Sequence, residues 1–340
     1  MKYWHIFVLA VLFSSALTGI LRRYALLRKI VDIPNSRSSH TEDTPRGGGL
    51  AVVLVFSLCL LFPSVNDQLP LSLLVALFSG VWVALVGFCD DHSHIPARWR
   101  LLVHFAAAVW ALFWLGGMPP VAAFGGVFYL GWLGHLLAVF YFVWLLNLYN
   151  FMDGIDGIAG IEAVTVCLGG ALVYTFVFPD GEGWVLPVLL ATSVAGFLFW
   201  NYPRAKIFMG DVGSGFIGFM LGILSIYAAC LSFILFWCWL ILLGVFVVDA
   251  TVTLFRRILR GEKFYEPHRN HAYQYASRKH GAHWPVSTAV AIINILWLLP
   301  IALLVAVGQL GGVVGVVVGY GPLIWLAFRY KAGARDLLSF

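Results

Sequence analysis

Residues 208–231 read FMGDVGSGFIGFMLGILSIYAACL. One aspartate among glycines comes first, and an apolar run then extends from residue 214 to residue 231. A helix needs about 20 apolar residues to cross the hydrocarbon core of a bilayer. This stretch therefore predicts a membrane-spanning helix with an acidic residue, Asp211, at its polar end.

Ten further apolar runs repeat this pattern, and the breaks between them hold proline, glycine and charge. Together the runs cover residues 3–21, 48–62, 71–88, 101–116, 130–148, 158–178, 185–200, 214–231, 233–255, 286–307 and 312–328. Only 11% of the residues are charged, against about 25% in soluble domains. We expect an all-α polytopic membrane bundle of about 11 transmembrane helices, in a single domain over residues 1–340.

The positive charges indicate how the chain is oriented. When alternate loops are assigned to one side, 20 of the 21 basic residues fall on that side and only Lys2 falls outside it. Because lysine and arginine are enriched in cytoplasmic loops, we expect the N-terminus outside and the C-terminus in the cytoplasm. The active-site loops would span 22–47, 89–100, 147–157, 201–213 and 256–285 on the cytoplasmic face. The net charge of +5 is too small to indicate a nucleic-acid partner.

Acidic residues lie at or near helix ends in four of these five loops, where charge is costly unless it is solvated, paired or bound to a metal. Asp90 and Asp91 follow the third apolar run. Adjacent carboxylates repel each other, and both stay ionised only near cations or water. A solvated helix terminus is the alternative, although the C-terminus of a helix disfavours anions.

The loop after the fifth run reads NLYNFMDGIDG from residue 147 to residue 157. Asn147, Asn150 and Asp153 are spaced by about one helical turn. Their oxygens would then line one face of a helix, and Mg²⁺ prefers oxygen ligands. The alternative is a glycine-rich turn with aspartates as helix caps, but that role explains only one aspartate well.

Two later loops suit phosphate groups. Asp211 precedes the eighth run, and the free amides at a helix N-terminus attract phosphate; a capping role for this aspartate is the alternative. The loop after the ninth run contains His268, Arg269 and His271. Arginine binds phosphate bidentately, whereas a basic loop that meets anionic lipid headgroups is the alternative.

Two other features give weaker signals. Residues 47–49 are three glycines beside Arg46, and their amides could form an anion-binding nest. Asp249 lies within the ninth run, two helical turns before Arg256. Intramembrane charges are usually paired, so Asp249 fits a buried structural partner better than a catalyst.

Together these loops resemble the polyprenyl-phosphate N-acetylhexosamine-1-phosphate transferases of glycosyltransferase family 4. The similarity runs in order along nearly the whole chain, through Asp32 to Gly49, Asp90-Asp91, Asn147 to Gly157, Phe208 to Asp211, and His268 to His271. The likeness is greatest to the O-antigen-initiating branch. Arg269 and Asn270 interrupt the histidine cluster that the peptidoglycan enzyme carries, which argues against a muramoyl-pentapeptide substrate.

The resemblance implies a helical bundle in the bacterial inner membrane with its active site facing the cytoplasm. It implies transfer of N-acetylhexosamine-1-phosphate (N-acetylglucosamine, N-acetylfucosamine or a related sugar) from a UDP-sugar to undecaprenyl phosphate. UMP is released, and lipid-linked O-antigen or other cell-envelope polysaccharide synthesis begins. The implied cofactor is Mg²⁺, with Mn²⁺ as an alternative. The implied partners are the UDP-N-acetylhexosamine, undecaprenyl phosphate and membrane lipid, and homo-oligomerisation is left open.

The resemblance also assigns roles by position. Asn150 and Asp211 would ligate the metal. The catalytic set would be Asp90, Asp91 and Asp211. The substrate-binding set would comprise Arg46, Asn147, Asp153, Asp156, Asn201, His268, Arg269 and His271.

The residues allow a direct displacement in which a phosphate attacks a diphosphate, because such a reaction needs cations to screen two anions and groups to align them. An ion-coupled membrane transporter is the alternative function. Transporter sites usually lie near the bilayer midplane on broken helices, whereas these acidic residues gather at one interface. A non-catalytic scaffold would not need so many acidic and amide groups in order.

Overall fold

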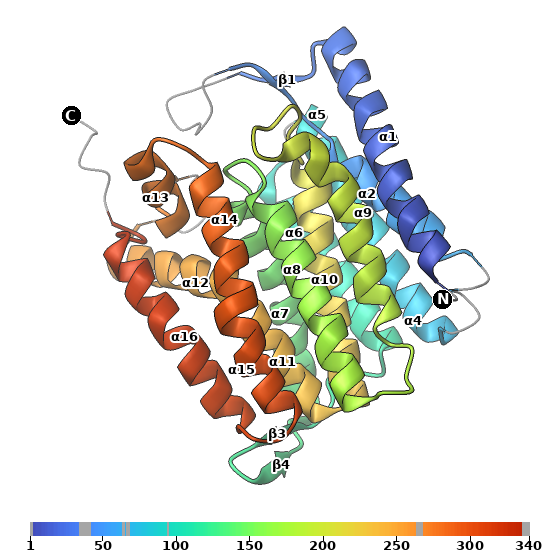
Figure 1. Ribbon diagram of the computed structural model, residues 1–340, viewed down its shortest axis with the longest axis vertical. Helices are drawn as coiled ribbons and strands as arrows, with labels where there is room; N and C mark the ends of the chain where they lie inside the picture. The colour runs from blue at the N-terminus through green and yellow to red at the C-terminus, as the bar shows by residue number, and fades with distance from the viewer. Residues whose placement is uncertain are drawn as a thin grey trace.

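The computed structural model describes residues 3–33, 42–62, 65, 69–93, 95–262 and 268–334. Parts of loops 22–47 and 256–285 therefore lie outside the described residues. The structure consists of helices and two small sheets (Figure 1). In chain order the elements are α1 (Trp4–Arg28), β1 (Val31–Asp32), β2 (Thr44–Pro45), α2 (Gly49–Cys59), α4 (Leu71–Phe78), α5 (Gly80–His92), α6 (Ala97–Trp114), β3 (Val121–Ala123), β4 (Gly126–Phe128), α7 (Gly131–Met152), α8 (Ile158–Val177), α9 (Val185–Asn201), α10 (Asp211–Leu231), α11 (Phe233–Leu242), α12 (Gly244–Leu259), α13 (Ala272–His280), α14 (Trp284–Ile293), the π-helix η1 (Asn294–Leu298), α15 (Leu299–Ala306) and α16 (Gly312–Arg329).

The helical bundle agrees with the predicted class of multi-pass membrane protein. Every apolar run predicted from the sequence contains at least one helix. In the described chain, seven helices are long and apolar enough to cross a membrane, and the bent pair α11 and α12 makes an eighth span if it is counted as one. α2 and α9 are shorter apolar helices. The expected total of about 11 spans stays a prediction.

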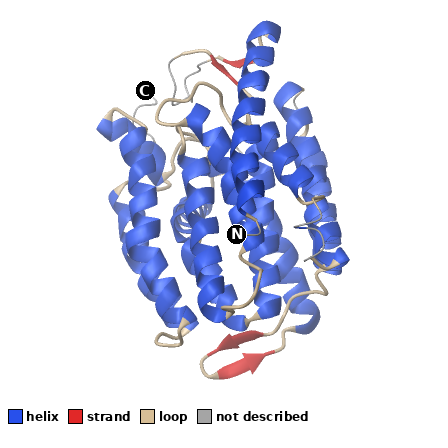
Figure 2. Cartoon of the chain, turned by 45° about the vertical axis from the view of Figure 1, so that its right-hand side comes forward, coloured by secondary structure: helices blue, strands red, loops and turns tan. Residues whose placement is uncertain are grey.

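The two sheets mark opposite ends of the bundle (Figure 2). β1 and β2 pair antiparallel, with Val31 opposite Pro45. β3 and β4 form a hairpin at the other end, with Val121 opposite Phe128. Because β1, β2 and α13 lie at the same end (Figure 1), that end is called the site end below.

α10 is the central helix of the bundle, and 83% of the residues in its apolar stretch are buried. Glycines allow its neighbours to approach it closely. A Cβ added at Gly218 would lie 2.6 Å from the carbonyl oxygen of Leu145 in α7. A Cβ at Gly49 of α2 would lie 2.4 Å from the Cα of Gly213. Small residues favour such backbone contacts between membrane helices, so α2 and α7 are fixed against α10.

The run 233–255 was expected to form one helix, and this prediction is wrong. α11 and α12 instead meet at a bend of 68°. A Cβ at Gly244 would lie 2.9 Å from the ring of Tyr320 in α16, so a glycine at the bend makes room for that ring. The Tyr320 hydroxyl donates to the Leu240 carbonyl at 2.5 Å. It thereby satisfies a carbonyl in the last turn of α11, where helix carbonyls lose their partners.

Two polar side chains are buried among the apolar helices. Glu162 of α8 is 0% exposed, and Asn294 at the start of η1 is 2% exposed. The Asn294 amide nitrogen donates to Glu162 Oε2 at 2.7 Å and to Thr165 Oγ1 at 2.8 Å. Ionisable groups within membrane bundles are usually paired in this way. The contact joins α8 to the span formed by α14, η1 and α15.

We predict that Glu162→Ala lowers the thermal stability of the detergent-purified protein. The substitution leaves the buried Asn294 amide without its carboxyl acceptor, which costs about 1–3 kcal/mol. Leu168→Ala, on the exposed face of the same helix, serves as the control and should change the melting temperature little. Equal melting temperatures for the two variants would contradict the structural role of Glu162.

Candidate active site

Two segments distant in the sequence are paired through their backbones at the site end. The Phe208 amide donates to the Pro45 carbonyl at 2.7 Å. The amides of Gly48 and Gly49 donate to the carbonyls of Phe208 and Met209, both at 2.9 Å. This pairing sets the start of α2 beside the start of α10. Two of the three glycine amides are therefore already hydrogen-bonded to carbonyls. The prediction that these two amides bind an anion is wrong.

Asp91, in the last turn of α5, binds the first amides of α10. Its Oδ1 accepts from the Asp211 amide at 3.1 Å, and its Oδ2 accepts from the Val212 amide at 3.3 Å. A carboxylate is favourable there because the free amides and the helix dipole both attract it. Gly210 has a φ of +76°, and a Cβ at this position would lie 2.5 Å from Asp91 Oδ2. Asp91 therefore helps to position α10, and its side chain is only 2% exposed.

Two arginines link the aspartates into one network. Arg46 Nη2 lies 2.8 Å from Asp91 Oδ1 and 2.7 Å from Asp211 Oδ1. Arg100 pairs with Asp90 and lies 3.4 Å from Asp211 Oδ2. Burial acts to lower the pKa of Arg46, but the carboxylates of Asp91 and Asp211 outweigh it and raise the pKa above its ordinary value. Asp211 is thus the carboxylate that both arginines reach.

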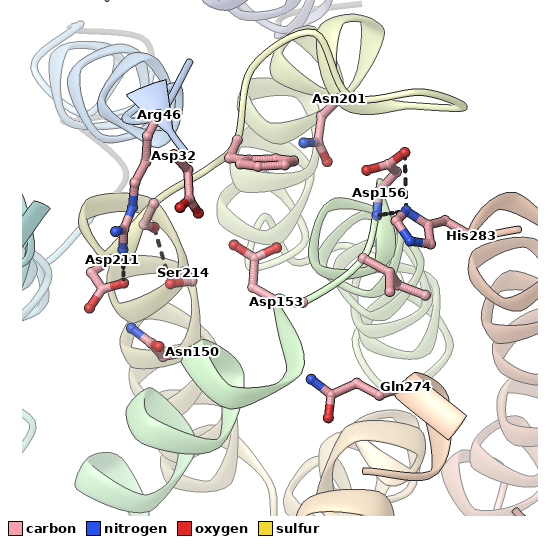
Figure 3. Close-up of a pocket in the computed structure, with 14 residues that line it drawn as sticks. Asp32, Arg46, Asn150, Asp153, Asp156, Asn201, Asp211, Ser214, Gln274 and His283 are labelled. Atoms are coloured by element: carbon pink, nitrogen blue, oxygen red, sulfur yellow. Dashed lines mark hydrogen bonds and ion pairs between the residues drawn. The ribbon is translucent and has the colours of Figure 1, made fainter. Parts of the chain in front are cut away.

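A polar pocket of about 230 Å³ opens beside this network (Figure 3). Its lining residues come from the loops that the sequence singled out and from α13. They are Asp32, Arg46, Asn150, Asp153, Gly154, Ile155, Asp156, Asn201, Phe208, Gly210, Asp211, Ser214, Gln274 and His283. Six residues of the predicted site lie among them: Arg46, Asn150, Asp153, Asp156, Asn201 and Asp211. The structure therefore brings together the predicted metal ligands and part of the predicted substrate-binding set.

Asp153 and Asp156, two acidic residues of the pocket, differ in their environments. Burial, followed by the nearby charge of Asp211, raises the pKa of Asp153 to about 7. Asp153 therefore changes charge near neutral pH. Asp156 Oδ2 lies 3.2 Å from His283 Nδ1, on the far side of the pocket from Asp211 (Figure 3). The pocket thus presents carboxyl oxygens from two sides.

A second pocket of about 550 Å³ adjoins the first. Asp156, Phe208 and His283 line both of them. The second pocket adds three arginines, which are Arg204, Arg269 and Arg278. The predicted Arg269 therefore lies in the adjoining space, which is the more basic of the two.

The other predicted site residues have different surroundings. Asp90 binds Arg100 and accepts from the Ile95 amide at 2.8 Å. Asn147 donates to the Val143 carbonyl at 2.7 Å and lines a separate cavity of about 40 Å³ that borders Asn150 and Asp211. Neither of these two residues lines the polar pocket.

Asn201 lines the pocket, but its amide group supports the backbone. Its Oδ1 accepts from the Gly157 amide at 2.9 Å, and its Nδ2 donates to the Ile207 carbonyl at 3.0 Å. Gly157 has a φ of +76°, in a region that favours glycine. Asn201 thereby joins the loop after α7 to the loop after α9.

The two histidines of the HRNH segment stack with ring centroids 5.0 Å apart. His271 is buried at the N-terminus of α13, and its Nδ1 lies 3.3 Å from Asp249 Oδ1. Asp249 also accepts from the amides of Ala272 and Tyr273 at 2.9 and 3.0 Å. Asp249 is therefore a buried structural residue, as expected, and it holds the N-terminus of α13. Burial lowers the pKa of His268 to about 3, so this ring is neutral at neutral pH.

Sequence reasoning gave no site role to Asp32, Gln274 or His283, which all line the pocket. Asp32 begins the segment from Asp32 to Gly49, but nothing in that segment distinguished this aspartate from an ordinary turn residue. Gln274 and His283 carry no motif of their own. Gln274 lies in α13, and His283 immediately precedes α14.

We predict that Asp91→Asn lowers the thermal stability of the ligand-free protein more than Asp90→Asn does. In Asp91 both oxygens accept backbone amides, so the asparagine leaves one amide of α10 unbonded, at a cost of about 1–3 kcal/mol. In Asp90 only one oxygen accepts an amide, and asparagine keeps that acceptor. Thermal unfolding in detergent measures the difference. Equal destabilisation by the two variants would contradict the positioning role of Asp91.

Comparisons with known proteins identify the family of this chain. A family model described as "Glycosyl transferase family 4" matches residues 73–229. A "Probable undecaprenyl-phosphate N-acetylglucosaminyl 1-phosphate transferase" of Bacillus subtilis (strain 168) is 30% identical over 274 residues, which are 78% of this chain and 75% of that protein.

Two further relatives are similarly named. An "Undecaprenyl-phosphate alpha-N-acetylglucosaminyl 1-phosphate transferase" of Thermotoga maritima is 28% identical over 79% of this chain and 80% of its own length. A "Decaprenyl-phosphate N-acetylglucosaminephosphotransferase" of Mycolicibacterium smegmatis is 29% identical over 62% of this chain and 56% of its own length. With its helical bundle, its acidic loops in order and these relatives, the chain belongs to glycosyl transferase family 4, among the polyprenyl-phosphate N-acetylhexosamine-1-phosphate transferases.

Proposed function

We propose that this protein transfers N-acetylhexosamine-1-phosphate from a UDP-sugar to undecaprenyl phosphate and releases UMP. The observation that carries the proposal is the convergence of Asn150, Asp153 and Asp211 beside Arg46 in one pocket. Oxygen ligands next to an arginine suit a reaction between two phosphate groups. The named activities of the relatives support this assignment.

The site would face the cytoplasm of a bacterial inner membrane, with the N-terminus outside, about 11 spans and the C-terminus inside. The arginines of both pockets and of the aspartate network lie at the site end, as cytoplasmic loops require. A site there meets both substrates, because the UDP-sugar arrives from water while the polyprenyl phosphate moves within the membrane.

The donor set fits Mg²⁺, with Mn²⁺ as an alternative. Among the described residues, no three His, Cys, Asp or Glu side chains form a metal site by themselves. Mg²⁺ is usually held by one or two carboxylates together with substrate phosphates, so a complete protein cage is not needed. Asn150 and Asp211 would hold the ion, which would screen the diphosphate charge.

The protein's own groups would align and neutralise the reactants. An oxygen of the lipid phosphate attacks the β-phosphorus of the UDP-sugar, and the bond from that phosphorus to the UMP oxygen breaks. The phosphate monoester has a second ionisation near about pH 6, so a strong base is not required. Arg46 offsets negative charge at the diphosphate, and Asp90 would position the lipid phosphate through Arg100 or accept its residual proton.

The nucleotide would extend from the polar pocket into the adjoining basic pocket. Asp156 borders both and would meet the uridine, while Arg269 would meet phosphate or the N-acetyl sugar. His268, which stacks on His271, would support the segment that carries Arg269. The pathway proposed is initiation of lipid-linked O-antigen or another cell-envelope polysaccharide, with N-acetylglucosamine, N-acetylfucosamine or a related sugar.

A direct assay tests the function. Purified protein is incubated with undecaprenyl phosphate, Mg²⁺ and a panel of radiolabelled UDP-N-acetylhexosamines, and lipid-linked sugar and UMP are measured. We expect product with at least one sugar. Asp211→Asn should lower turnover by about 10²-fold or more, the typical effect of losing one group that stabilises the transition state.

Asp180→Asn, in an exposed loop away from the pocket, is the matched control and should retain full activity. The melting temperature of each variant separates lost chemistry from lost folding. Binding of UDP-sugars without any product would contradict the proposal and favour a scaffold. Full activity of Asp211→Asn would remove this residue from the site.

A further inference from the structure

A third pocket lies on the other side of α13 from the polar pocket. It has a volume of about 310 Å³ and is enclosed by α12, α13, α14 and α16, which adjoin one another in Figure 1. Its wall is mostly aliphatic and includes Val245, Val286, Val290, Leu323 and Leu326. This volume is at the lower limit of ligand pockets, which hold about 300–1,000 Å³.

The position of this pocket suits a membrane lipid. Pro285 and Val286 belong to the first turn of α14, and Leu326 and Ala327 belong to the last turn of α16. The spans that contain α14 and α16 are both long and apolar enough to cross a membrane. The pocket therefore lies near the bilayer boundary at the site end, where an acyl chain and its headgroup meet.

Basic residues lie next to residues that line this pocket. Tyr330 and His280 both line it, with their rings 6.3 Å apart. Lys279 Nζ lies 5.7 Å from the centre of the Tyr330 ring. Arg329 and Lys331 flank Tyr330 in the sequence. Basic pockets between membrane helices on the cytoplasmic side of a bilayer favour anionic headgroups, so a phospholipid with a net negative charge suits this position better than a neutral one.

The pocket is also connected to the candidate active site through Tyr273. Tyr273 lines the apolar pocket, and its hydroxyl donates to the Phe151 carbonyl at 3.0 Å. A Cβ at Gly154 of the polar pocket would lie 2.2 Å from the same hydroxyl oxygen. A molecule in the apolar pocket would thus contact α13, the helix that places Gln274 in the polar pocket.

We propose that this pocket binds one acyl chain of an anionic phospholipid, with the headgroup against Lys279, Arg329 and Lys331. The lipid is a structural ligand that supports α13, and it is not the polyprenyl substrate. Two features separate it from the substrate site: its lining is mostly aliphatic, unlike the polar pocket, and α13 stands between the two pockets.

Photo-crosslinking tests the site without depending on activity. The full-length protein is placed in phosphatidylcholine vesicles containing a trace of phosphatidylglycerol with a diazirine at the end of one acyl chain. Crosslinked peptides are identified by mass spectrometry. We expect crosslinks to α14 and α16 at the pocket. Equal labelling by a phosphatidylcholine probe of the same chain length would overturn the preference for an anionic headgroup.

Two variants and a competitor sharpen the test. Ala289→Phe fills the pocket from an exposed position on α14 and should abolish these crosslinks, while Ile292→Phe, exposed on the same helix outside the pocket, should keep them. Lys279→Gln should weaken labelling about fivefold, which corresponds to the roughly 1 kcal/mol that one basic residue contributes near anionic lipid. Retained labelling in Ala289→Phe would overturn the site. Displacement by excess undecaprenyl phosphate would assign the pocket to the substrate instead.

Discussion

The carboxylate of Asp91 accepts the first two backbone amides of α10 and also binds Arg46. Because α10 is packed on most sides by other helices, the position of its first turn determines where the neighbouring site residues lie. Arg46 also binds Asp211. The hydrogen bonds from the amides of Gly48 and Gly49 to the chain before α10 hold the start of α2 beside the start of α10. The pocket exists because these segments meet at one helix end.

Buried acidic residues in this protein fall into two groups with different tasks. Asp91, Glu162 and Asp249 are bonded to amides or to an asparagine and connect helices. Asp153 and Asp211 line the pocket, and burial keeps Asp153 near its titration point. A buried charge is costly without partners. The first group is held by backbone amides or by Asn294, whereas Asp211 is held by Arg46 and Arg100 beside the pocket.

Much of this organisation could be predicted from the sequence. Each apolar run contains a helix, because a bilayer requires long apolar segments. Asn150, Asp153 and Asp211 could be placed in one site because the order of the apolar runs predicts that their loops lie on one side of the membrane. Hydropathy does not report the direction of a helix axis, so the bend between α11 and α12 after Leu242 could not be predicted from it. The partner of Asp249 was also missed, since His271 lies 22 residues away along a chain that folds back. Gln274 enters the site by the same fold, without any motif.

The central claim is that the diphosphate of the nucleotide binds between Arg46, Asn150 and Asp211. An experimental structure of the protein with UDP and Mg²⁺ tests this claim most directly. We predict the diphosphate in the polar pocket beside these three residues, with the uridine extending past Asp156 toward the basic pocket. A nucleotide bound elsewhere, with only solvent in the polar pocket, would contradict the claim.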